Sequence, residues 1–254
     1  MKAMILAAGL GTRLRPVTDD RPKALVEVGG RTLLEIALSG LRRFGVREVI
    51  VNVHHLADMV VGYLKANNNF GIRIEVSRED ELLDTGGGVK KAAWFFLEDS
   101  GNRDEAFILH NVDVISTIDL GRMVKVHSER KALATLAVQK RETSRYLLFD
   151  EQLRLCGRRT GGAEQPLRGR TGESPVSTRA SQALAFCGIH VISPRIFPRM
   201  TEEGVFSIIE SYVRLAAQGE NIQAFCADEY YWRDLGRPEN VAQAERDFKN
   251  KLVF

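Results

Sequence analysis

The chain has 254 residues, of which 44% are hydrophobic and 27% are charged. This composition is typical of a globular protein with a sizeable core, and it excludes a chain that is disordered throughout. No apolar run reaches the ~20 residues that span a bilayer. The net charge of +3 comes from the segment 158–182, whose arginines are not accompanied by clustered aromatic residues, so we expect neither a nucleic-acid-binding protein nor a membrane protein.

The chain begins with an apolar run, 3–8, that stops at a glycine and is followed at once by Arg13 and Arg15. A signal peptide would need a longer apolar segment and a small-residue cleavage site. The run is therefore predicted to be a buried strand. The three cysteines are widely spaced and form no CxxC pair, which indicates free thiols in a reducing compartment and a cytoplasmic protein.

Strands and helices alternate over the first 115 residues. The spacing of apolar residues predicts, in order, strand 3–8, helix 34–44 capped by Gly45, strand 47–53, helix 56–64, strand 72–76, helix 89–97 and strand 106–114. This alternation favours an α/β fold with a parallel sheet covered on both faces, in which ligands bind beyond the carboxyl ends of the strands. The polar segments "AAGLGTR" and "HNVDV" follow the first and fourth strands. We therefore expect both on the same rim of the sheet.

The second half is less regular. It predicts strands 132–139, 146–149, 153–157, 183–192 and 222–227, a helix that stops at Gly219, a turn region at "YYWRDLGRPENV" and a final helix that starts at Pro238. The segment 158–182 is rich in Gly, Arg, Ser and Pro and is predicted to be an exposed flexible loop, either a solvated insertion or a flap over an anionic substrate. With no repeat and no linker in evidence, residues 1–254 are predicted to form a single domain.

The stretch "GLGTRLRP" matches no common nucleotide motif. The dinucleotide fingerprint requires a third glycine where Leu14 stands, and an acidic residue after the second strand, where Asn52 begins "NVH". The P-loop string and the G-x-S-x-G string of serine hydrolases are also absent from the sequence.

What remains is a glycine turn followed by cations. Gly9 and Gly11 allow the backbone to approach a ligand, Arg13 and Arg15 offer forked donors for phosphate oxygens, and Lys23 adds a point charge. These residues indicate a phosphate site, although a turn that carries surface arginines has the same pattern.

The string "LAAGLGTRLRPVT", followed by "PKALVEVGGRTLLE", resembles the signature of the sugar-1-phosphate nucleotidylyltransferases, or NDP-sugar pyrophosphorylases. The segments "LDTGGGVKKA", "HNVDV", "FCGIHVIS" and "YYWRDLGRPENV" occur in the family's order, so the resemblance extends from Met1 to about Glu245. The chain is most similar to short members such as N-acetylmuramate 1-phosphate uridylyltransferases and mannose- or heptose-1-phosphate guanylyltransferases.

The resemblance implies a Rossmann-like three-layer sandwich with a mixed, mainly parallel central sheet. It implies an enzyme that transfers a nucleoside monophosphate from an NTP, UTP or GTP above all, to a sugar 1-phosphate with Mg²⁺, and that is a monomer or homodimer. An inactive regulatory protein that binds a nucleotide or sugar nucleotide, and a dinucleotide-dependent oxidoreductase, are the alternatives.

The resemblance also assigns site residues. The nucleotide would be held by Leu6, Ala7, Ala8, Gly9, Gly11, Thr12, Arg13, Lys23, Thr85, Gly86 and Gly87. The catalytic residues would be Arg13, Lys23, Asp113 and Asp234, and the two aspartates would bind Mg²⁺. Sugar contacts would come from Asn111, Gly188 and Glu210, of which Glu210 is equally well explained as a solvated helix residue. The family often has glycine directly before the metal-binding aspartate, where this chain has Val112, which puts the geometry of the sugar site in doubt.

Overall fold

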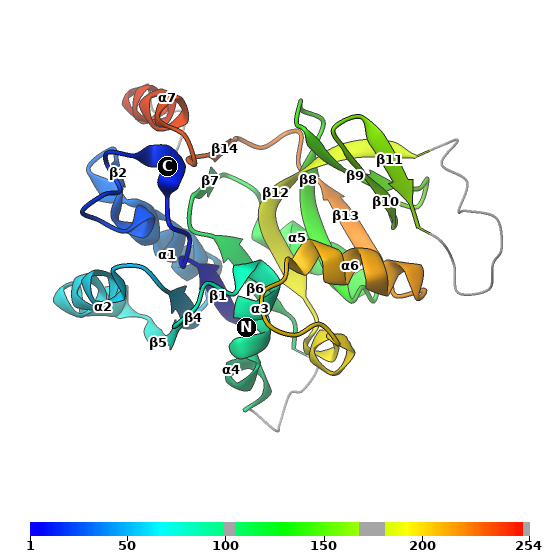
Figure 1. Ribbon diagram of the computed structural model, residues 1–254, viewed down its shortest axis with the longest axis horizontal. Helices are drawn as coiled ribbons and strands as arrows, with labels where there is room; N and C mark the ends of the chain where they lie inside the picture. The colour runs from blue at the N-terminus through cyan, green and yellow to red at the C-terminus, as the bar shows by residue number, and fades with distance from the viewer. Residues whose placement is uncertain (99–104, 168–180, 251–254) are drawn as a thin grey trace.

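The computed structural model describes residues 1–98, 105–167 and 181–250. Its centre is a mixed sheet whose parallel strands lie on the left of Figure 1 and whose antiparallel strands lie on the right. The parallel part has the order β6-β1-β4-β5, formed by β6 (Phe107–Asn111), β1 (Lys2–Leu6), β4 (Glu48–Val53) and β5 (Arg73–Arg78). These are the four strands predicted in the first half of the chain.

The antiparallel part is built outward from one long strand. β12 (Gln182–Ile192) runs antiparallel to β6 and to its other neighbours β8 (Ala134–Gln139) and β9 (Arg145–Phe149). Beyond them lie β13 (Ile222–Cys226), which is parallel to β8, then β10 (Leu155–Thr160), which pairs with β9, and the edge strand β11 (Ala163–Pro166). The predicted α/β fold with a mixed sheet is therefore confirmed.

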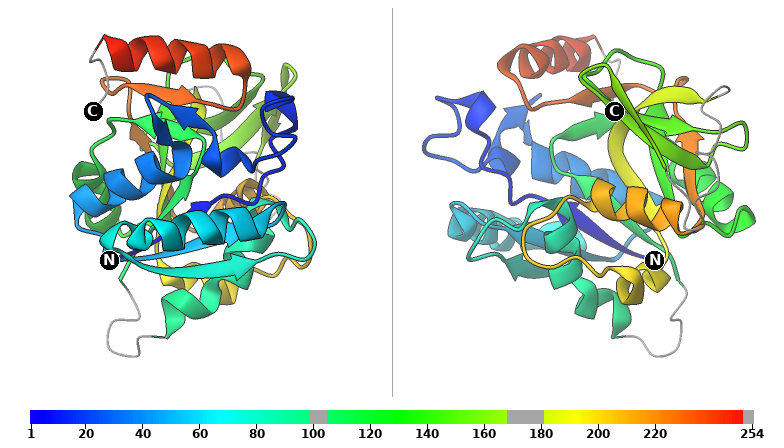
Figure 2. Two further views of the ribbon diagram at one scale, coloured as in Figure 1. Left: turned by 90° about the vertical axis from the view of Figure 1, so that its left-hand side faces the viewer. Right: turned by 45° about the vertical axis from the view of Figure 1, so that its right-hand side comes forward.

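Helices cover both faces of the sheet, because the strands are apolar on both sides. Within β1, Ala3 and Ile5 face one buried cluster and Met4 faces the other. The first cluster includes residues of α1 (Leu33–Phe44), α2 (Ala57–Ala66), α5 (Leu120–Glu129) and α7 (Pro238–Lys249). The second includes residues of α3 (Asp84–Lys91), α4 (Ala93–Leu97) and α6 (Ile208–Ala217). The result is a three-layer sandwich (Figure 2).

The helix boundaries follow local chemistry. α1 begins where the Thr32 hydroxyl accepts the Glu35 amide at 3.1 Å and ends at Gly45, whose φ of 100° suits glycine. The helix predicted over 89–97 is two helices that meet at Ala92, and the glycines before it lie inside α3 rather than in a turn. α5 was not predicted, because its buried side chains are Met123 and His127, and one apolar residue with one histidine does not form a recognisable apolar face.

Three other elements differ from the prediction. The strand predicted over 106–114 divides into β6 and β7 (Val114–Ser116), and the predicted turn region 230–241 contains β14 (Trp232–Asp234). A small hairpin of β2 (Glu27–Val28) and β3 (Arg31–Thr32) precedes α1. The strands β7, β14, β2 and β3 have only two or three residues each, too few to show an alternating pattern.

The prediction of a loop over 158–182 is wrong for the first part of that segment. There β10 and β11 form a hairpin, with Thr160 opposite Ala163. The turn is Gly161-Gly162, whose φ values of 58° and 87° are those of a tight hairpin turn. β10 is buried over its first three residues and less buried toward Thr160, and β11 forms the edge of the sheet, where polar residues are common. Residues 168–180 lie outside the described part of the chain. No helix within the described ranges is long and apolar enough to cross a bilayer.

Candidate active site

The two polar segments that follow β1 and β6 emerge side by side. The strands are parallel neighbours, with Leu6 opposite Asn111, and the Val112 amide donates to the Leu6 carbonyl at 3.1 Å. The expectation that "AAGLGTR" and "HNVDV" share one rim of the sheet is therefore confirmed.

A cavity of about 370 Å³ opens at this rim. Seven of the residues predicted for the site line it: Leu6, Ala8, Gly9, Lys23, Thr85, Asn111 and Asp113. The remaining lining residues were not predicted for the site: Asn52, Glu79, Leu82, Asp84, Val112 and Val205. Of these, Val112 is mentioned in the sequence analysis, as the residue that replaces the family's glycine. The valine is 4% exposed and packs into the core as well as bordering the cavity.

Lys23 and Asp113 form an ion pair at the cavity wall. Lys23 begins a short 3-10 helix after Pro22, and Asp113 lies in the turn between β6 and β7. Their side chains are 11% and 14% exposed. Two charges withdrawn this far from water require a partner of opposite sign. The pair thus places one cation and one carboxylate in the wall of the cavity.

Asp234 is brought next to Asp113 by a two-stranded sheet. β14 runs antiparallel to β7, with Asp234 opposite Val114, and the Leu235 amide donates to the Asp113 carbonyl at 2.8 Å. A Cβ atom at Gly236 would lie 2.6 Å from Arg13 Nη2 and 2.8 Å from Asp234 Oδ1. The guanidinium of Arg13 therefore lies beside Asp234, and a Cβ at position 236 would force one of these two side chains to shift.

The donors at this place suit a hard divalent cation. Mg²⁺ is usually bound by one or two protein carboxylates together with water and substrate oxygens. Asp113 and Asp234 supply two carboxylates, and the described ranges contain no group of three or more His, Cys, Asp or Glu side chains that could hold a metal. Beside them, the buried Oδ1 of Asn111 accepts no hydrogen bond from any described residue. The residues present therefore fit Mg²⁺ that is shared with a substrate.

The glycine loop after β1 is a tight turn. Gly11 has a φ of 67°, and a Cβ there would lie 2.9 Å from the Thr18 methyl group. The Thr18 hydroxyl donates to the Gly11 carbonyl at 2.8 Å. Thr12 and Arg13 follow on an exposed 3-10 helix (Thr12–Leu14) whose last side chain is buried. The turn thus presents Thr12 and Arg13 outward while Leu14 anchors it.

A buried polar network that the sequence analysis missed supports the cavity floor. Asn52 accepts the Ala7 amide at 2.7 Å and donates to Glu79 Oε1 at 2.7 Å. The other carboxylate oxygen of Glu79 accepts the Leu83 amide at 3.0 Å. Asn52 is 2% exposed and Glu79 is 5% exposed. The network ties the loop after β1 to the start of α3; its signal in the sequence was an asparagine inside the apolar run "VIVNV".

Asn52→Ala is expected to lower the free energy of unfolding by about 1–3 kcal/mol, because it removes the hydrogen-bond partner of the Ala7 amide and of Glu79 Oε1, both of which are buried. The same change should weaken nucleotide binding, since both walls of the cavity lose their link. Urea denaturation and nucleotide titration measure the two effects. Asn67→Ala, which removes an exposed hydrogen bond to the Tyr63 carbonyl, is the control; equal losses in both variants would show that the network has no special role.

The glycine run in α3 serves close packing. A Cβ at Gly86 would lie 2.3 Å from the Phe206 ring, and one at Gly87 would lie 2.5 Å from the Gly204 carbonyl. The Gly86 amide donates to the Phe206 carbonyl at 2.9 Å, and Thr85 Oγ1 accepts the Ile208 amide at 3.0 Å. The glycines therefore admit the segment before α6, a requirement that the sequence analysis did not foresee. Their contact with a nucleotide stays a prediction.

Gly86→Ala should destabilise the protein by about 1–3 kcal/mol, the usual cost of inserting a methyl group into a packed contact. It should also raise the KM for the NTP, because Val205 and Thr85 border the cavity on either side of this contact. Gly62→Ala in α2 is the matched control, since a Cβ there meets no atom within 4 Å among the described residues. That variant should be no less stable than the parent. Thermal melts and initial rates distinguish the two.

The predicted sugar contacts separate into two groups. Gly188 lies in β12 with a φ of 75°, and a Cβ there would lie 2.9 Å from Asn111 Nδ2. These two residues are therefore adjacent. Glu210 is exposed in the first turn of α6 and is absent from the residues that line the cavity.

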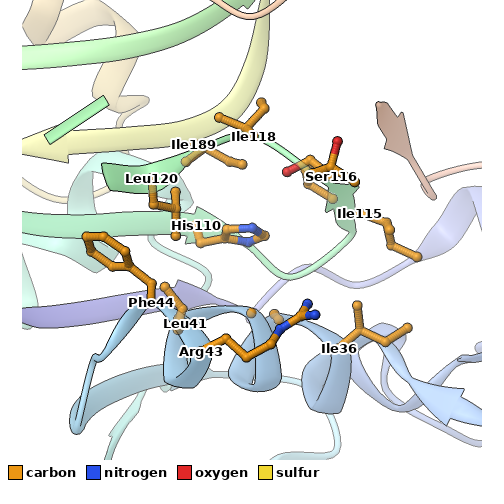
Figure 3. Close-up of a pocket in the computed structure, with 14 residues that line it drawn as sticks. Ile36, Leu41, Arg43, Phe44, His110, Ile115, Ser116, Ile118, Leu120 and Ile189 are labelled. Carbon is orange, nitrogen blue, oxygen red and sulfur yellow. The ribbon is translucent and has the colours of Figure 1, made fainter. Parts of the chain in front are cut away.

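A second cavity, of about 380 Å³, lies on the other side of β6 (Figure 3). Neighbouring residues of a strand point to opposite faces, so His110 points into this cavity while Asn111 lines the first. Burial lowers the pKa of His110 and keeps the imidazole neutral. The other walls are mainly apolar, and none of the predicted site residues lines it.

Comparison with known proteins identifies the family of the chain. A family profile described as nucleotidyl transferase matches residues 2–251. The N-acetylmuramate alpha-1-phosphate uridylyltransferase of Caulobacter vibrioides is 34% identical over 96% of this chain and 95% of its own length. The mannose-1-phosphate guanyltransferase of Aspergillus fumigatus is 30% identical over 94% of this chain but only 62% of its own length.

Solved structures show the same fold. HddC from Yersinia pseudotuberculosis, complexed with GMP-PN, superposes with a TM-score of 0.75 at 22% identity, covering 97% of this chain and 99% of its own. A UDP-glucose pyrophosphorylase complexed with UDP-glucose has a TM-score of 0.75 at 18% identity, covering 98% of both chains. The chain therefore belongs to the nucleotidyl transferase family, which confirms the resemblance to the sugar-1-phosphate nucleotidylyltransferases and their reaction class, nucleotidyl transfer.

Proposed function

We propose that the chain transfers a nucleoside monophosphate from an NTP to a sugar 1-phosphate by in-line attack at the α-phosphorus, with Mg²⁺, and releases pyrophosphate. The observation that carries this proposal is the ion pair of Lys23 and Asp113 in the cavity wall. The pairing of β14 with β7 brings the backbone of Asp234 next to that of Asp113, and the Arg13 guanidinium lies next to Asp234. A phosphoryl-transfer site requires such a combination of cations and metal-binding carboxylates, because the transition state spreads negative charge over several oxygens.

The protein's part in this reaction is alignment and charge stabilisation. Mg²⁺ held by Asp113 and Asp234 would neutralise charge on the α-phosphate and on the leaving pyrophosphate. The Lys23 ammonium is proposed to contact an oxygen of the attacked phosphate, and the Arg13 guanidinium, a forked donor, to contact the phosphates that leave. A phosphate oxygen of the sugar 1-phosphate is the nucleophile, so no nucleophilic side chain is required.

The cavity is proposed to hold the nucleoside. Its apolar wall comes from Leu6, Ala8 and Gly9, with Thr85 at the start of α3. Asn111 and its neighbour Gly188 are proposed to contact the sugar, and the unpaired Oδ1 of Asn111 is an acceptor for a sugar hydroxyl. Gly86, Gly87 and Glu210 receive no further support from their positions.

Burial raises the pKa of the Cys187 thiol to about 12 and that of Cys156 to about 11. These thiols remain protonated and unreactive at neutral pH. All three cysteines are free, which supports a proposed location in the cytoplasm. That the chain is a single domain, and a monomer or homodimer, also remains a proposal.

The test is pyrophosphate release with Mg²⁺ from a panel of UTP, GTP, ATP, CTP and dTTP, each paired with glucose, mannose, heptose and N-acetylmuramate 1-phosphates. We expect release with UTP or GTP and one of these sugar phosphates, since the curated relatives are uridylyl- and guanylyltransferases. Binding of a nucleotide without turnover of any pair would instead favour an inactive regulatory protein.

A further inference from the structure

The strand that carries Asp234 presents its two faces to different parts of the protein. Side chains alternate along a strand, so Trp232 and Asp234 share one face and Tyr231 and Arg233 share the other. Trp232 Nε1 donates to the Cys187 carbonyl of β12 at 2.7 Å. The rotation of β14 about its own axis therefore helps to determine where the Asp234 carboxylate points, together with the Gly236 amide, which donates to Asp234 Oδ1 at 2.8 Å.

The opposite face of β14 is held by one buried carboxylate of α7, that of Asp247, which is 4% exposed. Its Oδ2 accepts the Tyr231 hydroxyl at 2.6 Å and two donors of Arg233, Nε at 3.1 Å and Nη2 at 2.9 Å. Its Oδ1 accepts Gln243 Nε2 at 2.8 Å. Such a carboxylate, buried and fully hydrogen-bonded, fixes the geometry of its partners.

α7 also holds the backbone on both sides of the candidate metal site. Asn240 Nδ2 donates to the Asp234 carbonyl at 2.8 Å. At the far end of the helix, Glu245 accepts the Gly29 amide at 2.8 Å, and the Phe248 ring packs so closely on Gly29 that a Cβ there would lie 2.6 Å from it. Gly29 belongs to the hairpin that follows Lys23. Figure 1 shows α7 beyond β14 and β2, outside the central sheet.

We propose that Asp247 is a positioning residue, which acts through Tyr231 and Arg233 to hold β14 in the rotation that turns Asp234 toward Asp113. The proposal rests on the proposed function, because it concerns the metal site of that reaction. Asp247 itself touches neither the cavity nor the two aspartates. Residues that orient a metal ligand commonly change metal affinity by about 10–100-fold when they are altered.

Asp247→Asn tests this directly, because it keeps the size of the side chain and removes the charge that holds Arg233. Trp232 lies in β14, and Trp94 is the other tryptophan of the chain, so in a Trp94→Phe background the fluorescence of Trp232 reports on the strand. Mg²⁺ is titrated in the presence of UTP or GTP without a sugar phosphate. We expect the half-saturating Mg²⁺ concentration to rise about tenfold or more and kcat to fall about 10–100-fold, with little change in NTP affinity without Mg²⁺.

Glu239→Gln, at an exposed position in the first turn of α7, is the matched control and should leave both Mg²⁺ dependence and kcat unchanged. A lower melting temperature with Mg²⁺ dependence within twofold of the parent would overturn the proposal and leave Asp247 with a purely structural role. Tyr231→Phe removes one hydrogen bond to Asp247 and provides the same test if Asp247→Asn does not fold. Because the titration needs no turnover, its result stands even if the proposed reaction fails.

Discussion

Asp113→Asn is expected to lower kcat by about 10³-fold, the upper end of what one charge-stabilising group contributes to catalysis. The amide cannot bind a divalent cation as the carboxylate can, and it cannot neutralise Lys23. Nucleotide binding should survive, because the cavity is lined by other residues from several segments. Steady-state rates over a range of Mg²⁺ concentrations, together with nucleotide titration, separate these effects.

The control for this change is Asp58→Asn in α2, where the carboxylate is 90% exposed and pairs with Arg78 on the surface. That variant should keep the parent rate, since exposed pairs contribute about 0–1 kcal/mol to stability and neither Asp58 nor Arg78 lines the cavity. A rate within a few-fold of the parent for Asp113→Asn, in protein shown to be folded, would remove the metal assignment. Asp113→Asn removes the counter-ion of Lys23 and is therefore expected to lower the melting temperature. All rates are measured well below the melting temperature of this variant.

Lys23→Ala should lower kcat by about 10²–10³-fold with a smaller effect on KM, because the ammonium acts on charge that develops at the attacked phosphate. Lys23→Arg should recover only part of this loss. A guanidinium keeps the charge, but it is larger and planar, and the site leaves the lysine side chain 11% exposed. Initial rates with each substrate varied in turn give the division between kcat and KM.

Lys125→Ala is the matched control for Lys23→Ala, since that lysine is 73% exposed on α5. The double variant Lys23→Ala, Asp113→Asn provides a second check. Residues in contact give effects that do not add, so its loss should be clearly smaller than the product of the two single losses. Full additivity would show that the ion pair is not a functional unit.

The parallel half of the fold could be predicted from the sequence because β1, β4 and β6 are covered on both faces. Such strands appear as short apolar runs, and the helices between them carry one apolar face and recognisable caps such as Thr32 and Gly45. The common rim of the first and fourth strands followed from parallel pairing alone. Parallel pairing thus predicts that the segments of Gly9 and Asp113 lie close together.

The rest of the site depends on contacts that periodicity does not encode. β7 and β14 have three residues each, and only their pairing brings Asp234 to Asp113. The resemblance implies a role for both aspartates. The hydrogen bond from the Leu235 amide to the Asp113 carbonyl, which brings their backbones together, could not be derived from their spacing in the sequence. Glu79 lies in a polar stretch where a buried carboxylate is not evident. Gly86 and Gly87 of α3 are predicted to hold the nucleotide, and the structure adds a packing role that the sequence does not reveal, because they admit Phe206 and the Gly204 carbonyl.

The most direct test of the proposed reaction follows the phosphates. The NTP and sugar 1-phosphate that release pyrophosphate are incubated with Mg²⁺, with the NTP labelled either at the α- or at the γ-phosphorus. Attack at the α-phosphorus predicts the α label in the NDP-sugar and the γ label in pyrophosphate, with both signals lost on chelation of the metal. A γ label that appears in inorganic phosphate or on the sugar, or an α label that appears in a free nucleoside diphosphate, would contradict it.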